Sequence, residues 1–247
     1  MQQYFVKGLA SSPITIEDKE TSKHMFQVMR VKEEDEVTLV FDDGIKRLAR
    51  VVNVESRQLE LVEELDDNVE LPVQVTIASG FPKGDKLEFI TQKVTELGAS
   101  QIWAFPADWS VAKWDGKKLG KKVEKLEKIA LGAAEQSKRN LVPSISLFEK
   151  KADFLAQFDQ FDQIVVAYEE SAKEGEAATL IQSLTGLEAG SKLLFIFGPE
   201  GGLSPAEIES FTVKGAILAG LGPRILRAET APLYALSAVS VVTELMN

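Results

Sequence analysis

From Val73 to the end of the chain, short apolar runs alternate with longer stretches of helical periodicity. The apolar runs, rich in β-branched and aromatic residues, predict buried strands at Val73–Ser79, Gln101–Phe105, Gln163–Tyr168 and Lys192–Phe197. The stretches between and after them predict helices at Lys83–Leu97, Lys117–Lys138, Ser204–Phe211 and Thr230–Met246. This alternation predicts an α/β domain, residues 73–247, with a parallel sheet covered by helices. Ligands of such sheets bind beyond the carboxyl ends of the strands.

Residues 1–70 have a different pattern, with a period of two in short segments. Strands are predicted at Tyr4–Lys7, Glu36–Phe41, Ile45–Val54 and Gln58–Glu63, with Asp42-Asp43-Gly44 as a hairpin turn. A helix is predicted over Glu17–Val28, with Thr15 and Asp18 as a capping box. An acidic run, 63–67, ending near Pro72 reads as a linker. The sequence therefore predicts a small N-terminal β-barrel domain, residues 1–70.

The composition excludes several kinds of chemistry. The chain has no cysteine and a single histidine, His24, so disulfides, thiolate nucleophiles, Cys-ligated zinc and histidine metal clusters are excluded. The N-terminus lacks the pattern of a signal peptide. The apolar segment Pro232–Val242 is shorter than the roughly 20 residues that span a bilayer. We therefore expect a cytoplasmic protein without a metal centre and without a membrane segment.

Charge is unevenly distributed in this acidic chain, whose net charge is −10. Residues 1–70 have 9 Lys or Arg against 16 Asp or Glu, whereas residues 83–151 have 14 against 9. A basic stretch of this kind fits a polyanion, but charge alone favours a solvated helix face. The lysines that form the predicted stripe are Lys118, Lys121, Lys122 and Lys125.

The segment Phe195–Glu207, FIFGPEGGLSPAE, joins a strand to a helix through a glycine-rich loop. Ser204 is a natural N-cap, Pro205 suits the first turn, and Glu207 completes a capping box. Glycines there permit positive φ and a close approach of the backbone to a ligand, although a tight turn alone also requires them. The spacing is neither that of a phosphate-binding P-loop nor that of the GxGxxG dinucleotide motif.

A second junction of the same type follows at Leu218–Pro232, LAGLGPRILRAETAP, with two arginines and a glutamate at its exit. The two glycine loops could line opposite sides of one flat ligand. The end of a preceding strand, Ala167-Tyr168-Glu169-Glu170, is the third candidate wall. Together these segments predict a ligand cleft near the C-terminal end of the sheet.

The two glycine-rich blocks resemble those of the SPOUT class of RNA methyltransferases, which use S-adenosylmethionine (SAM), and within it the RsmE family. Further matches are His24–Val31, Lys83–Lys86, Lys93, Glu96–Gly98 and Glu135–Arg139, so that the resemblance covers essentially the whole chain. It implies a PUA-like N-terminal barrel, a C-terminal trefoil knot and a homodimer. It also implies methylation of N3 of a uridine (m3U1498) in the 16S rRNA of assembled small ribosomal subunits.

The resemblance implies that the loops bind SAM as the methyl donor. Candidate cofactor contacts are Ala167, Tyr168, Gly198, Pro199, Glu200, Gly201, Leu221, Gly222, Ile225, Leu226 and Ala231. A cation facing the uracil carbonyl oxygens would stabilise the charge that develops when N3 loses its proton. Arg227 is the candidate for that role, and Glu229 for orienting it or relaying the proton; an ordinary salt bridge is the alternative. No general base is assigned.

Candidate phosphate contacts are Arg30, Lys83 and Arg139. We expect His24 to pack rather than to catalyse. Among the tryptophans, Trp103 is expected in the core, whereas Trp109 and Trp114 could stack on bases. The apolar final helix is expected to be buried or paired with a second subunit.

The chain departs from the family pattern at two places. Gln3 stands where the family usually has an arginine, which weakens an RNA-gripping role for the N-terminal arm. Trp109-Ser110-Val111 replaces Arg-Ser-Val, which removes one expected RNA-facing cation, although Lys113 is close in sequence.

Three other functions remain open at this point. A SPOUT enzyme could act on a different RNA. A nucleotide-binding enzyme of flavodoxin-like type would need neither the barrel nor the basic helix. A non-catalytic RNA-binding ribosome assembly factor would dispense with the glycine loops.

Overall fold

The computed structural model describes residues 1–168 and 178–246, which form two compact units. The first unit consists of Met1–Glu70 and Ala134–Leu141, and the second of Leu71–Ala133 and Val142–Asn247. Residues 134–141 join the N-terminal unit although they lie beyond the boundary predicted from the sequence. The reason is a set of polar contacts between this segment and the first 70 residues, which linear patterning does not reveal.

The first unit is built on a five-stranded sheet with the order β1-β3-β4-β5-β2. The strands are β1 (Gln3–Phe5), β2 (Ile14–Thr15), β3 (Glu36–Val40), β4 (Lys46–Asn53) and β5 (Gln58–Leu65). β1 pairs with β3 in parallel, and the other pairs are antiparallel. Tyr4, Met25, Leu39 and Val51 belong to its apolar core. The predicted turn is confirmed: Gly44 has a φ of 73° and its N–H donates to the carbonyl of Phe41.

The helix predicted at Glu17–Val28 is confirmed as α1 (Lys19–Ser22), which continues as the π-helical segment η1 (Lys23–Val28). Its cap differs from the prediction. Thr15 lies in β2, so the predicted capping box is wrong, and Asp18 alone caps the helix by accepting a 2.7 Å hydrogen bond from the N–H of Thr21. The two-residue strand β2 is too short to produce a periodic signal.

The second unit contains a six-stranded parallel sheet with the order β11-β9-β10-β6-β7-β8. Its strands are β6 (Gln74–Gly80), β7 (Gln101–Phe105), β8 (Ser144–Leu147), β9 (Gln163–Ala167), β10 (Lys192–Phe197) and β11 (Ile217–Ala219). The predicted parallel α/β domain is confirmed, with the addition of β8. The trefoil knot stays a prediction.

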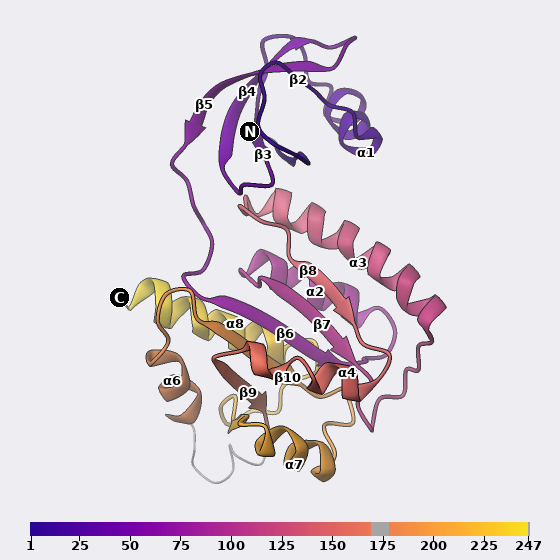
Figure 1. Ribbon diagram of the computed structural model, residues 1–247, viewed down its shortest axis with the longest axis vertical. Helices are drawn as coiled ribbons and strands as arrows, with labels where there is room; N and C mark the ends of the chain where they lie inside the picture. The colour runs from indigo at the N-terminus through magenta and orange to yellow at the C-terminus, as the bar shows by residue number, and fades with distance from the viewer. Residues whose placement is uncertain (169–177, 247) are drawn as a thin grey trace. The chain divides into compact units, whose positions relative to one another are not determined.

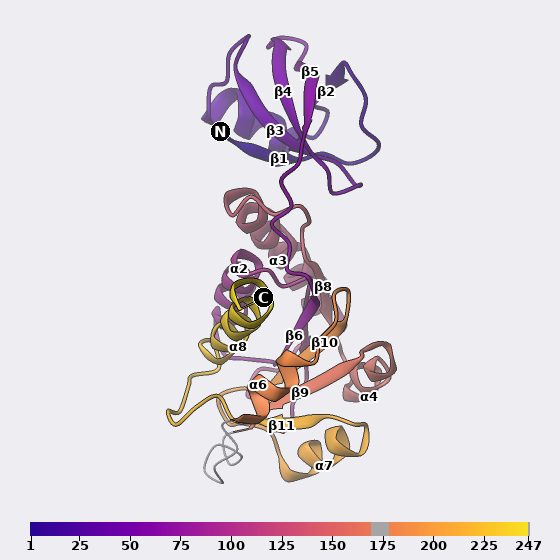
Figure 2. The same cartoon turned by 90° about the vertical axis from the view of Figure 1, so that its left-hand side faces the viewer.

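Helices cover both faces of this sheet (Figures 1 and 2). One face packs against α2 (Lys86–Glu96), α6 (Ala178–Thr185) and α8 (Ala231–Ser240), which is followed by η3 (Val241–Leu245). The other face packs against α4 (Lys151–Leu155), η2 (Phe158–Gln160) and α7 (Pro205–Val213). The long helix α3 (Gly116–Gln136) packs beside α2 through Leu119 and Leu126.

The helix α2 shows how local sequence positions the edge of this sheet. Leu87, Ile90 and Val94 follow the helical period and are at most 2% exposed, so each contributes about 1.5–3 kcal/mol by burial. The helix stops at Gly98, whose φ is 102° and whose missing Cβ would lie 2.8 Å from Leu71. The predicted glycine stop is thus confirmed, and the start of α2 is fixed just after the end of β6. No helix in the described part of the chain is both long and apolar enough to cross a bilayer.

Candidate functional site

Several loops of the second unit leave the same edge of its sheet. β6, β10, β9 and β11 are parallel, and β10 lies between β9 and β6, with β11 beyond β9. The loop after β6 therefore lies at the same edge as the glycine loops after β10 and β11. The end of β9 is held there as well, because the N–H of Tyr168 donates to the carbonyl of Ala219 over 3.0 Å.

The loop after β10 needs its glycines for packing within the protein. A Cβ on Gly198 would lie 2.8 Å from the backbone of Gly202, and Gly202 itself has a φ of 78°. A Cβ on Gly201 would lie 3.0 Å from the Cβ of Trp109. The N–H of Gly202 closes the turn by donating to the carbonyl of Pro199 over 2.8 Å. The loop is thus a tight, internally packed turn with one side against Trp109.

The predicted capping box at the start of α7 is confirmed. The Ser204 hydroxyl accepts from the N–H of Glu207 at 3.2 Å, and the Glu207 carboxylate accepts from the N–H of Ser204 at 2.9 Å. Two residues that sequence reasoning missed complete the anchor. Lys151 lies 2.6 Å from Glu207 and 2.5 Å from Asp108, which also accepts from the Ser204 hydroxyl. The Lys151 hydrogen bond, followed by that of Ser204, lowers the pKa of Asp108.

In the loop after β11, the backbone N–H groups lack backbone hydrogen-bond partners among the described residues. Within the described structure, no N–H between Leu221 and Glu229 donates to a backbone carbonyl. The carbonyl of Arg227 accepts from the N–H groups of Thr230 and Ala231, which begins α8. Backbone donors that are free of protein partners must bond to water or to a ligand. This loop therefore presents polar backbone groups at the edge where the other loops end.

Lys86, at the start of α2, joins the two glycine loops. Its ammonium lies 3.0 Å from Glu200 in the loop after β10 and 3.0 Å from Glu229 in the loop after β11. Glu200 also accepts from the N–H of Lys83 at 3.1 Å. Three segments far apart in the sequence thus meet at one side chain. Sequence reasoning matched Lys86 to a family motif without assigning it this contact.

The ion-pair cluster keeps both carboxylates charged. Burial alone would raise the pKa of Glu200 and of Glu229, but the ion pairs with the Lys86 ammonium contribute to a net lowering of both. The contacts with Glu200 and then Glu229 raise the pKa of Lys86 correspondingly. Glu229 is therefore a weaker base than an ordinary glutamate.

The remaining predicted site residues differ in exposure. Arg227 is exposed and has no carboxylate within ion-pair distance among the described residues, so the predicted pairing with Glu229 is replaced by Lys86–Glu229. Ile225 is 78% exposed. Half-buried positions are Ala167, Tyr168, Leu221, Gly222, Leu226 and Ala231. Glu169 and Glu170 lie outside the described residues.

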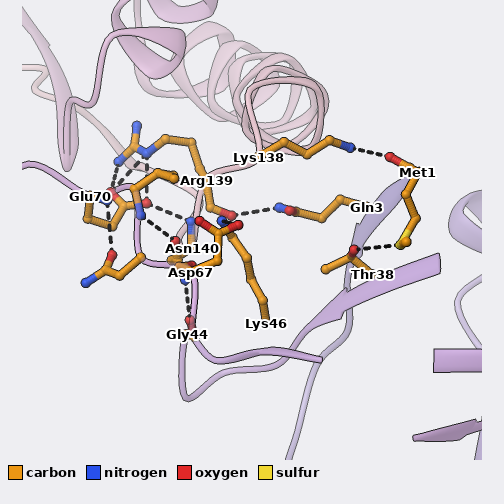
Figure 3. A network of polar contacts seen from close by, with 12 residues as sticks. Met1, Gln3, Thr38, Gly44, Lys46, Asp67, Glu70, Lys138, Arg139 and Asn140 are labelled. Carbon is orange, nitrogen blue, oxygen red and sulfur yellow. Dashed lines mark hydrogen bonds and ion pairs between the residues drawn. The ribbon is translucent and has the colours of Figure 1, made fainter. Parts of the chain in front are cut away.

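The three predicted RNA contacts differ sharply in exposure. Lys83 and Arg30 are exposed, Arg30 with a φ of 55° just after η1. Arg139 is 2% exposed and its guanidinium is paired with Glu70 (Figure 3). The side chain of Gln3 is also buried and donates to the carbonyl of Arg139 over 2.7 Å. Arg139 and Gln3 therefore stabilise the N-terminal unit instead of facing solvent.

The histidine and the three tryptophans singled out from the sequence differ in their surroundings. Trp103 is 4% exposed, which confirms its expected place in the core, and His24 packs against Tyr4 with an Nδ1–Oη distance of 3.3 Å. Trp109, by contrast, is 49% exposed beside the glycine loop. Trp114 is covered by Phe81 and by the ammonium of Lys122, 4.3 Å from its ring.

Part of the predicted lysine stripe is already engaged within the second unit. Lys125 pairs with Glu88 at 2.6 Å, and Lys122 covers Trp114. Lys118 lies 4.0 Å from Asp115 with both side chains 65% exposed, and Lys121 is exposed. Lys118 and Lys121 are thus the members most available to an anion.

The N-terminal unit has a cavity of its own, of about 590 Å³. Its walls include the carboxylates of Asp43, Glu64, Asp67 and Glu70. The charges there are largely paired: Lys46 with Asp67, Arg47 with Asp43 and Glu64, and Arg139 with Glu70. An acidic, internally paired cavity does not attract a phosphate backbone, so the glycine loops are the better candidate site.

Known proteins resemble this chain over its full length. The family model of an RNA methyltransferase domain matches residues 69–240 of this chain. The family model of an RNA methyltransferase PUA domain matches residues 16–64. Ribosomal RNA small subunit methyltransferase E of Bacillus subtilis (strain 168) is 45% identical over 253 residues, covering 100% of this chain and 99% of that protein.

Two solved relatives extend the comparison to structure. A methyltransferase of Legionella pneumophila, solved with its cofactor SAM, has a TM-score of 0.84 at 26% identity and covers 97% of this chain and 96% of its own. Ribosomal RNA small subunit methyltransferase E of Neisseria gonorrhoeae, bound to SAM, has a TM-score of 0.80 at 25% identity, covering 98% of each chain. The fold and the domain matches define an RNA methyltransferase with a PUA domain. Within that class, the chain belongs to the ribosomal RNA small subunit methyltransferase E (RsmE) family.

Proposed function

We propose that this protein transfers a methyl group from SAM to N3 of a uridine, position 1498, in the 16S rRNA of assembled small ribosomal subunits. The observation that carries the proposal is the junction of the two glycine loops at Lys86, at the carboxyl edge of a parallel sheet. Membership of the RsmE family and the SAM bound by the two solved relatives support it.

The residues at this edge fit a ligand that is partly nucleoside and partly amino acid. The open backbone groups between Leu221 and Glu229 suit the polar edge of a base, and half-buried Leu221, Leu226 and Ala231 suit its apolar faces. Bound SAM would supply an electrophilic methyl group. We assign the binding of SAM to the predicted contacts in both glycine loops and at Ala167 and Tyr168.

Arg227 is the proposed cation for the uracil oxygens. It is exposed in the loop after β11, and it forms no ion pair with a carboxylate among the described residues. Its charge would stabilise the uracil as N3 loses its proton, which is worth about 2.7–4 kcal/mol for one well-placed donor. Because Glu229 pairs with Lys86 and its pKa is lowered, we do not assign proton removal to Glu229.

RNA binding is proposed to use Arg30 and Lys83, both exposed. Trp109 is proposed to provide a stacking surface beside the glycine loop, in place of the arginine usual in the family.

A homodimer is proposed because apolar side chains stay exposed near the C-terminus: Tyr234 is 41%, Leu245 75% and Met246 70% exposed.

The test is methyl transfer from labelled SAM to purified small subunits, followed by mass mapping of the modified nucleoside. We expect one labelled uridine, methylated at N3. Label in another RNA or on another base would point to a different target. Absence of label with every subunit preparation would overturn the proposal.

The Gly201→Val variant separates an enzyme from a ribosome assembly factor. The added side chain meets Trp109 at 3.0 Å, so the loop must shift. We expect methylation to be lost while binding to small subunits is retained. Gly132→Ala is the control, because nothing lies within 4 Å of its added Cβ. Methylation by Gly201→Val at the rate of the unaltered protein would remove this loop from the proposed cofactor site, whereas subunit binding without methylation by the unaltered protein would favour the assembly factor.

A further inference from the structure

Lys86 is the point where the loops of the proposed SAM site meet. It is the first residue of α2, and its partners lie after two other strands, β10 and β11. Its side chain is 30% exposed, and those of Glu200 and Glu229 are 26% and 19% exposed. The cluster is thus neither a fully solvated surface pair nor a buried one.

The charges explain why the contact matters to loop position. Glu200 and Glu229 are both ionised, since the pKa of each is lowered. Oε1 of Glu200 and Oε2 of Glu229 each lie 3.0 Å from the Lys86 ammonium, so the two carboxylates are close together. Without an ammonium between them, two partly desolvated carboxylates would repel one another. The loop after β11 packs on the core through Leu221, but its backbone N–H groups make no backbone bonds among the described residues between Leu221 and Glu229.

We propose that Lys86 is a positioning residue that holds the two glycine loops in the arrangement that binds SAM. The inference rests on the proposed function and adds a residue to it. Lys86 acts through Glu200 and Glu229 rather than by touching the reacting atoms. Preorganised loops lose less conformational entropy when a ligand binds, so the contact should contribute to cofactor affinity.

A matched control lies on the same helix. Lys93 pairs with Glu96 at 2.8 Å, and its side chain is 34% exposed, close to the value for Lys86. The pair joins positions i and i+3 of α2, so it bridges no loops. Lys86→Met and Lys93→Met therefore remove the same charge from similar environments, but only the first releases the glycine loops.

The first measurement uses the full-length protein without any ligand. Amide hydrogen exchange should rise in residues 198–203 and 221–230 of Lys86→Met, and should be unchanged there in Lys93→Met. Lys86→Arg, which retains the charge, should keep most of the protection. Unchanged exchange in both loops of a folded Lys86→Met protein would overturn the proposal.

The second measurement is SAM binding by calorimetry. We expect the Kd to rise about tenfold in Lys86→Met, as for the loss of roughly 1.4 kcal/mol, with recovery in Lys86→Arg and no change in Lys93→Met. Should Lys86→Met not fold, Glu229→Gln, which weakens the pair without removing Lys86, provides the same comparison.

If the Kd rises while loop exchange is unchanged, Lys86 is a direct ligand contact and the positioning role is wrong. If the unaltered protein binds no SAM while loop exchange still responds, the proposed function fails and the loop contact stands.

Discussion

Each unit of the molecule contains an ion-pair network that joins segments far apart in the chain, and the two networks differ in exposure. In the N-terminal unit, Arg139 is 2% exposed and pairs with Glu70, which also accepts from the N–H of Asn140 at 2.7 Å (Figure 3). In the second unit, Lys86 is 30% exposed and joins the two glycine loops through Glu200 and Glu229. A buried network of this type stabilises one unit, whereas a partly exposed network at the ends of strands leaves room for a ligand.

The largest expected effect breaks the buried network. Arg139→Met leaves the Glu70 carboxylate without its charge partner, and breaking a buried pair in this way costs about 3–5 kcal/mol. We expect urea unfolding, followed by hydrogen exchange in β3 and β4, to show that loss. The control is Arg50→Met: Arg50 pairs with Glu36 at the surface, with side chains 43% and 36% exposed, and should cost at most about 1 kcal/mol. Equal effects of the two variants would contradict the distinction between the networks.

Arg227 sharpens the comparison because it belongs to neither network. Arg227→Ala should leave the unfolding free energy almost unchanged, since the side chain is exposed and pairs with no carboxylate in the described residues. Its kcat for methylation should fall by about a hundredfold, as for the loss of one charge-stabilising group. The assay is single-turnover methyl transfer at saturating SAM. A variant with normal kcat would remove Arg227 from the proposed site.

Glu135 tests whether burial alone, without a full ion pair, makes the N-terminal unit sensitive to pH. Burial raises the pKa of Glu135 to about 7, against the opposing hydrogen bond from Phe5 and the charge of Lys138. The folded protein therefore binds this proton more tightly than the unfolded chain, so the unfolding free energy should fall as the pH rises from about 4.5 to about 7. Glu135→Gln should flatten that part of the profile, measured by urea titration at several pH values. An unchanged profile in the variant would contradict the assignment.

The smallest effect concerns charges that no network engages. Lys118 and Lys121 are exposed on α3, whereas Lys125 is paired with Glu88. If Lys118 and Lys121 contact phosphates, Lys118→Gln and Lys121→Gln should each reduce the slope of log affinity against log salt concentration by about 0.9. The measurement is binding of small subunits at several salt concentrations. Slopes identical to that of the unaltered protein would identify the stripe as a solvated face.

The sequence predicted the elements with clear periodicity and missed those held by distant contacts. The strands β3 to β7, the capping box at Ser204 and Glu207, and the stop of α2 at Gly98 are local signals, and all are confirmed. β2 and β8 were missed because two to four residues give no reliable period. Burial of Arg139 could not be read from a motif, because its partner Glu70 lies in a different segment.

The candidate site shows the same division. Both glycine loops stood out as strand–loop–helix junctions, and the parallel sheet brings them to one edge. The contact of Lys86 with Glu200 and Glu229 was not predictable, because three separate segments contribute to it. The sequence suggested Glu229 for orienting Arg227 or relaying the proton, whereas in the fold the ion-pair partner of Glu229 is Lys86.

The most direct test of the account is amide hydrogen exchange of the full-length protein with and without saturating SAM. We predict that protection by SAM is concentrated in residues 198–203 and 221–230, with smaller changes at the end of β9. Protection confined to other segments of the sheet, or to the N-terminal unit, would contradict the assignment of the cofactor to the glycine loops.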